Sequence, residues 1–207
     1  PVYTDFWACN EEADVIVDFS NPASLDGLIE YATGHRLPLI IATTGYSEEQ
    51  TRKIQETATK IPVFFSFNMS LGVNLLAELA KKAPAFLGDQ FDIEIIEKHH
   101  NRKVDAPSGT ALMLADEICS VLPEPHTYMY DRHSVRRKRE KTEIGISSVR
   151  GGTIVGEHSV IFAGRDEIIE LKHTAMSREI FAVGALNGAV YMAGVKEPRI
   201  YTMADLL

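Results

Sequence analysis

Residues 38–44 read Pro-Leu-Ile-Ile-Ala-Thr-Thr, a short apolar run that ends in two hydroxyl side chains. Two comparable runs flank it, ADVIVDFS at residues 13–20 and PVFFSFN at residues 62–68. Each run has the length and composition of a buried β-strand, and each is followed by a segment with helical features. Continuous apolar strands that alternate with helices are typical of a parallel sheet covered on both faces. The first third of the chain therefore predicts a parallel α/β lobe.

The segments between these strands carry helix start and stop signals. Asn21 is a suitable N-cap, Pro22 suits the first turn, and Gly34 suits the end of that helix. Residues 47–50 (SEEQ) have the capping-box pattern, in which Ser47 and Gln50 satisfy amides of the first turn. We expect two consecutive strand–helix units here.

The rest of the chain changes character. We expect a strand over residues 91–100, a helix over 108–122, and a closing helix from 177 to about 195. Three further strands are expected, at residues 142–150, 153–163 and 167–175. The joints at Gly151-Gly152 and at residues 164–166 look like hairpin turns, so this part predicts an antiparallel or mixed sheet. We therefore expect an α/β fold in two lobes, residues 1–70 with 178–207 forming a parallel-sheet lobe and residues 71–177 forming an inserted α+β lobe.

Composition excludes several classes of protein. The 207 residues are 45% hydrophobic and 24% charged, which is typical of a globular chain and unlike a disordered or collagen-like one. No apolar run approaches the ~20 residues of a membrane-spanning helix, so we expect no membrane partner. The formal charge of −8 is unfavourable for a broad nucleic-acid surface. Cys9 and Cys119 are far apart and outside any CxxC spacing, which suits a reducing compartment and predicts a cytoplasmic protein.

The stretch EKHHNRKVDAPSGTA at residues 97–111 concentrates groups that bind anions. His99 and His100 are adjacent, Lys103 follows closely, and a helix is expected to begin after Pro107. The first amides of that helix belong to Ser108, Gly109 and Thr110. A helix N-terminus offers unpaired N–H groups and a partial positive charge, so a carboxylate or phosphate is favoured there. One imidazole of the pair is a candidate proton donor because histidine titrates near neutrality.

Each of these residues also has a structural interpretation. Lys103 alone suits a solvated side chain, Ser108 alone suits a helix cap, and a single histidine suits a structural role. A zinc site competes, but adjacent histidines on an extended chain point to opposite faces and no HxxxH or nearby Cys is present, so we expect no metal. Residues 132–141 (RHSVRRKREK) hold six Lys and Arg, and we favour a solvated loop there over a nucleic-acid site because no aromatic side chains are interleaved.

The ends of two strands in the first lobe are candidate ligand contacts, since ligands of open α/β sheets bind beyond the carboxyl ends of the strands. The candidates are Ala42, Thr43 and Thr44 after one strand, and Ser66, Phe67, Asn68 and Met69 after the next. Short hydroxyl side chains there allow a flat ring to approach the backbone, and both segments also suit simple turns. No GxGxxG or GxxxxGK[ST] loop occurs in the sequence.

The motif HHNRKVDAPSGTA strongly resembles the substrate motif of the dihydrodipicolinate reductase family. VDFSNP, ATTGYS, FNMSLGVN, VRGGTIVGEHSVIFAG and SREIFAVGALNGAVYMAG resemble further segments of that family in the same order, so the resemblance covers essentially the whole chain. It implies a partial Rossmann-like nucleotide-binding lobe and a substrate-binding lobe whose sheet joins subunits into a homotetramer. It also implies a reaction of lysine and diaminopimelate biosynthesis, in which NADH or NADPH transfers a hydride to a cyclic dicarboxylate and tetrahydrodipicolinate is formed.

The resemblance also implies roles for individual residues. His99 and Lys103 fall on the family's proton-transfer positions, and His100, Ser108, Gly109 and Thr110 fall on its substrate-binding segment. The residues at the two strand ends, 42–44 and 66–69, fall on the nicotinamide side. The family usually has glycine where Ala42 stands and phenylalanine where Met69 stands.

Family members begin with a glycine-rich βαβ unit that binds the pyrophosphate and with charged residues that contact the ribose. These are missing here, because Pro1 stands where a family member would already be past that unit. We therefore interpret the sequence as a reductase without its amino-terminal nucleotide-binding portion. The alternative is a non-catalytic dicarboxylate-binding or assembly module that has lost productive cofactor binding. Binding of a dicarboxylate without any binding of a nucleotide would favour that module.

Overall fold

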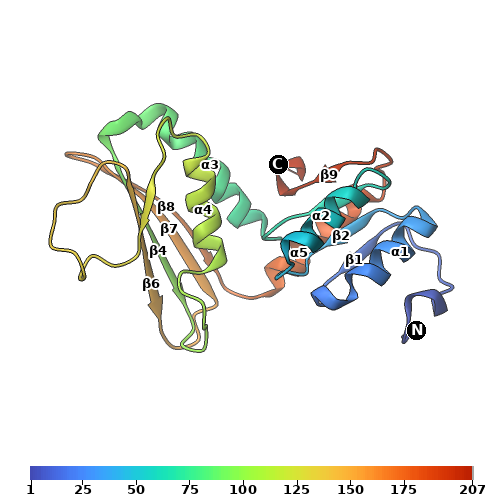
Figure 1. Cartoon of the computed structure of the whole chain (residues 1–207). Coiled ribbons are helices and arrows are strands. Elements are labelled where there is room, and N and C mark those ends of the chain that lie inside the picture. Colours follow the sequence, from blue (N-terminus) through green and yellow to red (C-terminus); the bar gives the residue numbers. More distant parts are fainter. Residues whose placement is uncertain (207) are drawn as a thin grey trace. The chain divides into compact units, whose positions relative to one another are not determined.

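The computed structural model describes residues 1–206, and the chain divides into two compact units (Figure 1). Unit 1 comprises residues 1–70 and the segment from residue 181 onward, and unit 2 comprises residues 71–180. The expected α/β class is confirmed, because unit 1 holds a parallel sheet and unit 2 a mixed sheet.

Unit 1 is built on four parallel strands in the order β1-β2-β3-β9. The strands are β1 (Ile16–Asp18), β2 (Leu39–Ile41), β3 (Val63–Phe65) and β9 (Ile200–Tyr201), and the helices are α1 (Leu25–His35), α2 (Glu48–Thr57) and α5 (Glu179–Met192), the last of which begins just before this unit. All three residues of β2 are fully buried, as expected for a central strand covered on both faces. Apolar side chains of α1 and α2 pack on the sheet and form one core with it.

One helix start follows its sequence signal directly. At the other, Asn21 and Pro22 begin a 3₁₀ turn (Pro22–Ser24), and α1 follows from Leu25. Ser47 Oγ accepts from the Gln50 amide, and the Gln50 side chain accepts from the Ser47 amide, so the capping box is present. The end of α1 at Gly34 was predicted wrongly, since the helix continues to His35 and Arg36 takes the left-handed conformation with φ 53°. Gly34 instead faces Trp7, whose ring lies 3.4 Å from where a Cβ would stand.

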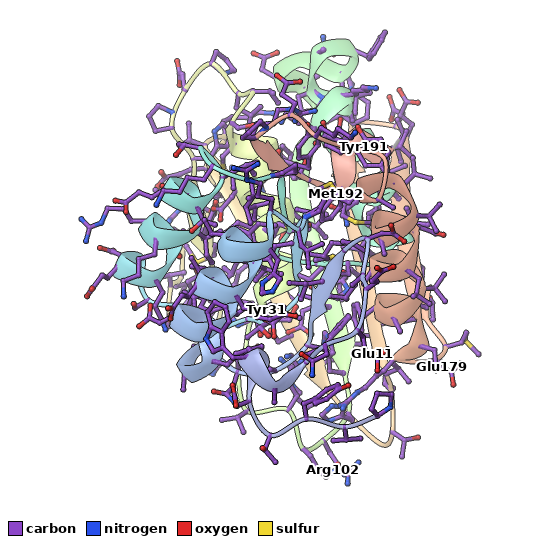
Figure 2. The ribbon with its side chains drawn as sticks, turned by 90° about the vertical axis from the view of Figure 1, so that its right-hand side faces the viewer. Glu11, Tyr31, Arg102, Glu179, Tyr191 and Met192 are labelled. Atoms are coloured by element: carbon purple, nitrogen blue, oxygen red, sulfur yellow. The ribbon has the colours of Figure 1, made fainter. Side chains whose placement is uncertain are left out.

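An aromatic cluster attaches the amino-terminal segment to α1. The rings of Trp7 and Tyr31 meet edge to face with centroids 5.6 Å apart, and Tyr31 and His35 lie at 4.2 Å. Figure 2 shows Tyr31 on α1 beside this segment. These contacts place residues 6–8, a short 3₁₀ turn, on the surface of the helix.

Unit 2 packs two helices on one face of a five-stranded sheet (Figure 1). The helices are α3 (Leu71–Leu87) and α4 (Gly109–Cys119), and the strands are β4 (Asp92–His99), β5 (Thr127–Met129), β6 (Glu143–Arg150), β7 (Gly156–Ala163) and β8 (Ile168–Ala175), in the order β5-β6-β4-β7-β8. The strict alternation of β4 buries every second residue, from Ile93 to His99, beneath the helices.

One of the two expected hairpins is wrong. β7 and β8 pair antiparallel across residues 164–166, as predicted. The hairpin at Gly151-Gly152 does not form, because β4 lies between β6 and β7, parallel to the first and antiparallel to the second. The turn signal was real, since Gly152 has φ +48°, but a turn signal does not specify which strands pair. The long buried strand β4 takes the central position because its alternate residues complete the core.

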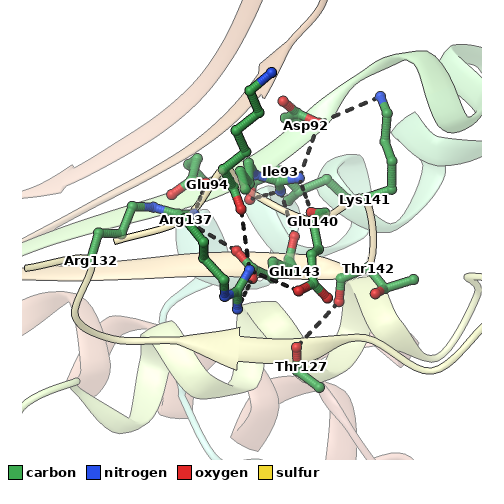
Figure 3. Close-up of polar contacts among 12 residues, drawn as sticks. Asp92, Ile93, Glu94, Thr127, Arg132, Arg137, Glu140, Lys141, Thr142 and Glu143 are labelled. Carbon is green, nitrogen blue, oxygen red and sulfur yellow. Dashed lines mark hydrogen bonds and ion pairs between the residues drawn. The ribbon is translucent and has the colours of Figure 1, made fainter. Parts of the chain in front are cut away.

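The basic run at residues 132–141 is held by carboxylates rather than fully solvated (Figure 3). Arg132 bonds Glu94 at 2.6 Å and Glu143 at 3.0 Å, and Arg137 also contacts the buried Glu143. Arg139 lies 3.0 Å from the carboxylates of both Asp92 and Glu94, and Lys141 lies 3.6 Å from Asp92. Much of the positive charge of this segment is therefore neutralised within unit 2.

Cys9 and Cys119 are both free thiols and partly exposed. Across residues 1–206, none of the helices combines the length and apolar character that crossing a membrane requires.

Candidate functional site

The candidate site of unit 2 starts from the last two inward positions of β4. Ile93 and Ile95 are apolar, but the same face continues with Glu97, which is fully buried, and His99, which is 9% exposed. A carboxylate and an imidazole thus replace apolar side chains at the end of the strand. A buried carboxylate is costly unless it is paired and hydrogen-bonded, so its partners define the site.

Glu97 is held from several sides. Arg150 of β6 donates to both carboxylate oxygens, from Nη1 at 2.8 Å and Nη2 at 2.7 Å, which is the bidentate geometry of a strong charge-assisted pair. The amide of Ser108 donates to Oε1 at 3.1 Å, and His99 Nδ1 lies 2.6 Å from Oε2. Burial raises the pKa of the Glu97 carboxyl, but the hydrogen bonds from Arg150, Ser148 and His99 outweigh it and lower the pKa to about 2. Glu97 is therefore an anion at all ordinary pH values.

Because Glu97 is ionised, it determines which ring nitrogen of His99 carries a hydrogen. A carboxylate only accepts hydrogen bonds, so Nδ1 of His99 must carry the hydrogen and donate it to Glu97. Nε2 is the ring nitrogen that Glu97 does not engage. A Cβ on Gly156 would stand 3.2 Å from Nε2, so the missing side chain at this β7 position gives the ring its room.

The start of α4 is joined to the same cluster. Ser108 Oγ accepts from the Ala111 amide at 3.2 Å and lies 2.9 Å from His158 Nε2. Desolvation by burial, with the nearby His99 next in size, lowers the pKa of His158 to about 4, so His158 is neutral at pH 7. The rings of His99 and His158 meet edge to face with centroids 5.2 Å apart. Ser108 is thus both the expected N-cap and a link between two histidines.

Two of the predicted anion-binding groups lie at this end of unit 2. Gly109 begins α4, and a Cβ there would meet no heavy atom within 4 Å, so the space beside this residue is open. Lys103 Nζ lies 2.9 Å from Asp105, and this hydrogen bond lowers the pKa of the Asp105 carboxyl. Arg150 Nη2 also donates to the Asp105 carbonyl at 2.6 Å. Arg150 thus connects the loop that carries Lys103 to Glu97.

His100 has a cationic neighbour that the sequence reasoning missed. Its Nε2 lies 3.2 Å from Arg178 Nη2, just before α5. Burial, followed by the charges of Arg178 and Arg102, lowers the pKa of His100, so its neutral form is favoured. Arg102 itself extends from the loop after β4 into solvent (Figure 2).

The structure therefore joins His99 and Ser108 through Glu97, and places Lys103, His100 and the start of α4 around the end of β4. Glu97, Arg150, His158 and Arg178 were not predicted as site residues. Glu97 lies in the motif that the sequence singled out, and a carboxylate on the inward register of an apolar strand was the signal that could have found it. Across residues 1–206, His, Cys, Asp and Glu side chains form no group of three suited to a metal ion.

Unit 1 has a second candidate site at the carboxyl ends of its strands. A hollow of about 230 Å³ is lined by Phe19, Ala42, Thr44, Ser66, Phe67, Asn68, Met69 and Phe181. Six of the seven strand-end residues expected from the sequence line it. Thr43 does not, because it is buried and its Oγ1 accepts from the Ser20 amide at 2.8 Å.

The hollow combines backbone, short side chains and exposed rings. Phe67 is 78% exposed and Phe19 is 54% exposed, so two aromatic faces are available to a planar ligand. Phe19 was missed by the sequence reasoning although it directly follows β1, at the strand end where such contacts are expected. These features fit a flat ring such as nicotinamide.

Comparison with known proteins shows which protein family the chain resembles along its length. The family models described as dihydrodipicolinate reductase, N-terminus, and dihydrodipicolinate reductase, C-terminus, match residues 1–69 and 72–207. The chain belongs to the dihydrodipicolinate reductase family. Its division by these two matches, between residues 69 and 72, coincides with the first boundary between units 1 and 2.

Individual relatives agree with this membership. The chain is 53% identical over 207 residues to the 4-hydroxy-tetrahydrodipicolinate reductase of Clostridium novyi (strain NT), with all of this chain and 81% of the relative covered. It is also 53% identical to the reductase of the same name from Caldanaerobacter subterraneus subsp. tengcongensis, covering 82% of that protein. The solved dipicolinate-bound dihydrodipicolinate reductase from Paenisporosarcina sp. TG-14 is 26% identical with a TM-score of 0.75, over 94% of this chain and 74% of that one.

Proposed function

We propose that this chain reduces 4-hydroxy-tetrahydrodipicolinate to tetrahydrodipicolinate with NADH or NADPH, a step of lysine and diaminopimelate biosynthesis. The family membership over both units supports this activity. The observation that carries it is the end of β4, where His99 and Ser108 bond to the buried Glu97 and Arg150 links that carboxylate to the loop that carries Lys103. These groups suit a small ligand that carries two carboxylates and accepts a proton.

In unit 2 the residues divide between binding and proton transfer. The amides of Gly109 and Thr110, with Ser108 as cap, bind one substrate carboxylate at the positive end of α4. His100 contacts the substrate, and its neighbour Arg178 adds positive charge. His99 donates the proton from Nε2, and Lys103 supplies positive charge and a second donor.

In unit 1 the hollow at the strand ends holds the nicotinamide. Ala42, Thr44 and residues 66–69 line it, and Phe67 offers a ring face. When bound, the nicotinamide supplies the hydride. Thr43, which lies between Ala42 and Thr44, is buried and bonds the Ser20 amide.

The same family membership supports further proposals on the domains, the assembly and the location of the protein. Residues 1–70 with 178–207 form the dinucleotide-binding domain, residues 71–177 bind substrate and join subunits, and the protein is a homotetramer. We place it in the cytoplasm.

The experiment is an initial-rate assay of the purified chain with 4-hydroxy-tetrahydrodipicolinate and either NADH or NADPH, combined with calorimetric titration of pyridine-2,6-dicarboxylate. We expect substrate-dependent oxidation of at least one nicotinamide and saturable dicarboxylate binding. Dicarboxylate binding without nucleotide binding or oxidation would overturn the enzymatic proposal and favour a non-catalytic dicarboxylate-binding module. Light-scattering mass measurement tests the tetramer.

A further inference from the structure

Glu97 has no free position for a ligand. Its side chain is fully buried, and Arg150, Ser108 and His99 direct four hydrogen bonds at its two oxygens. A carboxylate accepts about four such bonds, so Glu97 is saturated by the protein itself. Its contribution to the site must pass through the groups that it holds.

His99 is the group at the open end of this arrangement. Its Nδ1 is engaged by Glu97 at 2.6 Å, and within residues 1–206 we find no hydrogen-bond partner for Nε2. Gly156 lies on the Nε2 side of the ring, where a Cβ would stand at 3.2 Å, so the absent side chain leaves room beside that nitrogen. The imidazole is therefore held in one orientation with one nitrogen available.

Arg150 connects this orientation to the Lys103 loop. Its guanidinium spans both oxygens of Glu97 and the carbonyl of Asp105, whose carboxylate pairs with Lys103 at 2.9 Å. The Arg150 side chain thus holds both Glu97, which bonds His99, and the loop that carries Lys103.

We propose that Glu97, clamped by Arg150, is a positioning residue for His99: it holds the Nδ1–H and leaves Nε2 as the nitrogen that exchanges a proton with the ligand. This inference rests on the proposed function, in which His99 is the proton donor. When the Nε2–H bond breaks and the proton passes to the ligand, the ring changes from imidazolium to the neutral Nδ1–H form. Glu97 stays ionised throughout, and its charge stabilises the imidazolium before transfer.

The charged and titratable groups around His99 come from each packed element. Glu97 lies on β4 and His100 directly after it, Arg150 lies on β6, His158 on β7, and Lys103 in the loop before α4. Of these, Glu97 provides the negative charge in direct contact with the ring. Its removal should therefore destabilise the imidazolium.

The first test reads the tautomer directly and needs no activity. The ¹⁵N shifts of His99 in the full chain, assigned by comparison with His99→Gln, are measured at a pH where the ring is neutral. We expect a protonated, pyrrole-type Nδ1 and an unprotonated, pyridine-type Nε2. A neutral ring protonated at Nε2, or an even mixture of the two tautomers, would overturn the proposal.

The second test separates positioning from structure by kinetics. Glu97→Gln keeps the size of the side chain but removes its charge. Glu94→Gln is the matched control, because Glu94 lies on the same strand and is likewise paired with arginine, in its case Arg132 and Arg139. We expect Glu97→Gln to lower kcat at least ~10-fold with KM changed less than ~3-fold, and to move the alkaline limb of the kcat profile to lower pH. The control should keep the wild-type profile. A wild-type kcat and profile in Glu97→Gln would refute the proposal.

A second variant keeps the test decisive where Glu97→Gln fails to fold. Glu97→Gln combined with Arg150→Met removes both buried charges, which restores folding when an unpaired Arg150 was the cause. We expect this folded double variant to show the same loss of kcat and the same shift in the pH profile, and wild-type values would overturn the proposal. An inactive wild type with the Nδ1–H tautomer would reject the proposed reaction while the placement of His99 by Glu97 stands.

Discussion

Arg150 and Glu97 form a two-point ion pair, at 2.7 and 2.8 Å, between neighbouring parallel strands at the edge of the candidate site. Glu97 is fully buried and the Arg150 side chain is 19% exposed, so the pair lies largely out of water. It holds His99 on one side and the Lys103 loop on the other, so the geometry of the site depends on this charge pair.

Glu97→Ala should destabilise unit 2. The change leaves the Arg150 charge without its carboxylate, and loss of one partner of a buried pair costs about 3 kcal/mol. Urea unfolding followed by circular dichroism measures the free energy of unfolding. Glu94→Ala, whose side chain is 30% exposed, is the control and should cost less than about 1 kcal/mol. Equal losses of unfolding free energy in the two variants would show that the buried pair stabilises unit 2 no more than the exposed pair does.

His158 should make stability depend on pH. Its folded-state pKa of about 4 lies below the ordinary 6.5, so the unfolded chain binds the extra proton first as the pH falls. Its contribution is complete above pH 6.5 and is lost as the pH falls from there to about 4. Thermal unfolding across this range should show a steeper decline in Tm for the wild type than for His158→Gln. His133→Gln, at an exposed histidine, should follow the wild type, and parallel curves for all three proteins would contradict the assignment.

Lys103→Ala should impair both binding and turnover. The ammonium supplies positive charge for a carboxylate and a proton donor, so we expect kcat to fall by ~10-fold or more and KM to rise by a similar factor. Steady-state kinetics with varied substrate measures both constants. Lys82→Ala removes an exposed lysine on α3 and should leave them unchanged. A change in KM alone would assign Lys103 to binding only.

Gly184→Ala and Gly188→Ala should differ although both lie on α5. A Cβ at Gly184 would stand 1.6 Å from the Met69 carbonyl oxygen, whereas one at Gly188 would meet side-chain carbons at 3.5 Å or more. Because Met69 lines the hollow of unit 1, Gly184→Ala should raise the KM for the nicotinamide and lower Tm, while Gly188→Ala should do neither. Equal behaviour of the two variants would contradict the packing of α5 against residue 69.

Much of unit 1 follows from local sequence. The apolar runs before Ser20, Thr44 and Asn68 contain β1, β2 and β3, and the Ser47 capping box begins α2 as expected. The strands β5 (TYM) and β9 (IY) were missed because neither lies inside a longer apolar run like those that contain β1, β2 and β3. The wrong hairpin between β6 and β7 has another cause, since pairing with β4 is a long-range choice made by the core.

In the candidate site, too, local sequence reveals some residues and long-range pairing brings in the others. His99, His100, Lys103 and Ser108 lie within ten residues of one another, so the motif itself reveals them. Arg150 and His158 are 53 and 50 residues away from the partners that they contact, and only strand register brings them together. Glu97 pairs across the sheet with Ser148 on one side and His158 on the other, a relation that no local pattern contains.

The most direct test of the account is the steady-state rate of NADH and NADPH oxidation by the wild type and by His99→Gln, with 4-hydroxy-tetrahydrodipicolinate as substrate. We predict oxidation by the wild type only when substrate is present, and a fall in kcat of ~100-fold or more in His99→Gln with KM changed less than ~3-fold. No substrate-dependent oxidation by the wild type, or an unchanged kcat in the variant, would contradict the account.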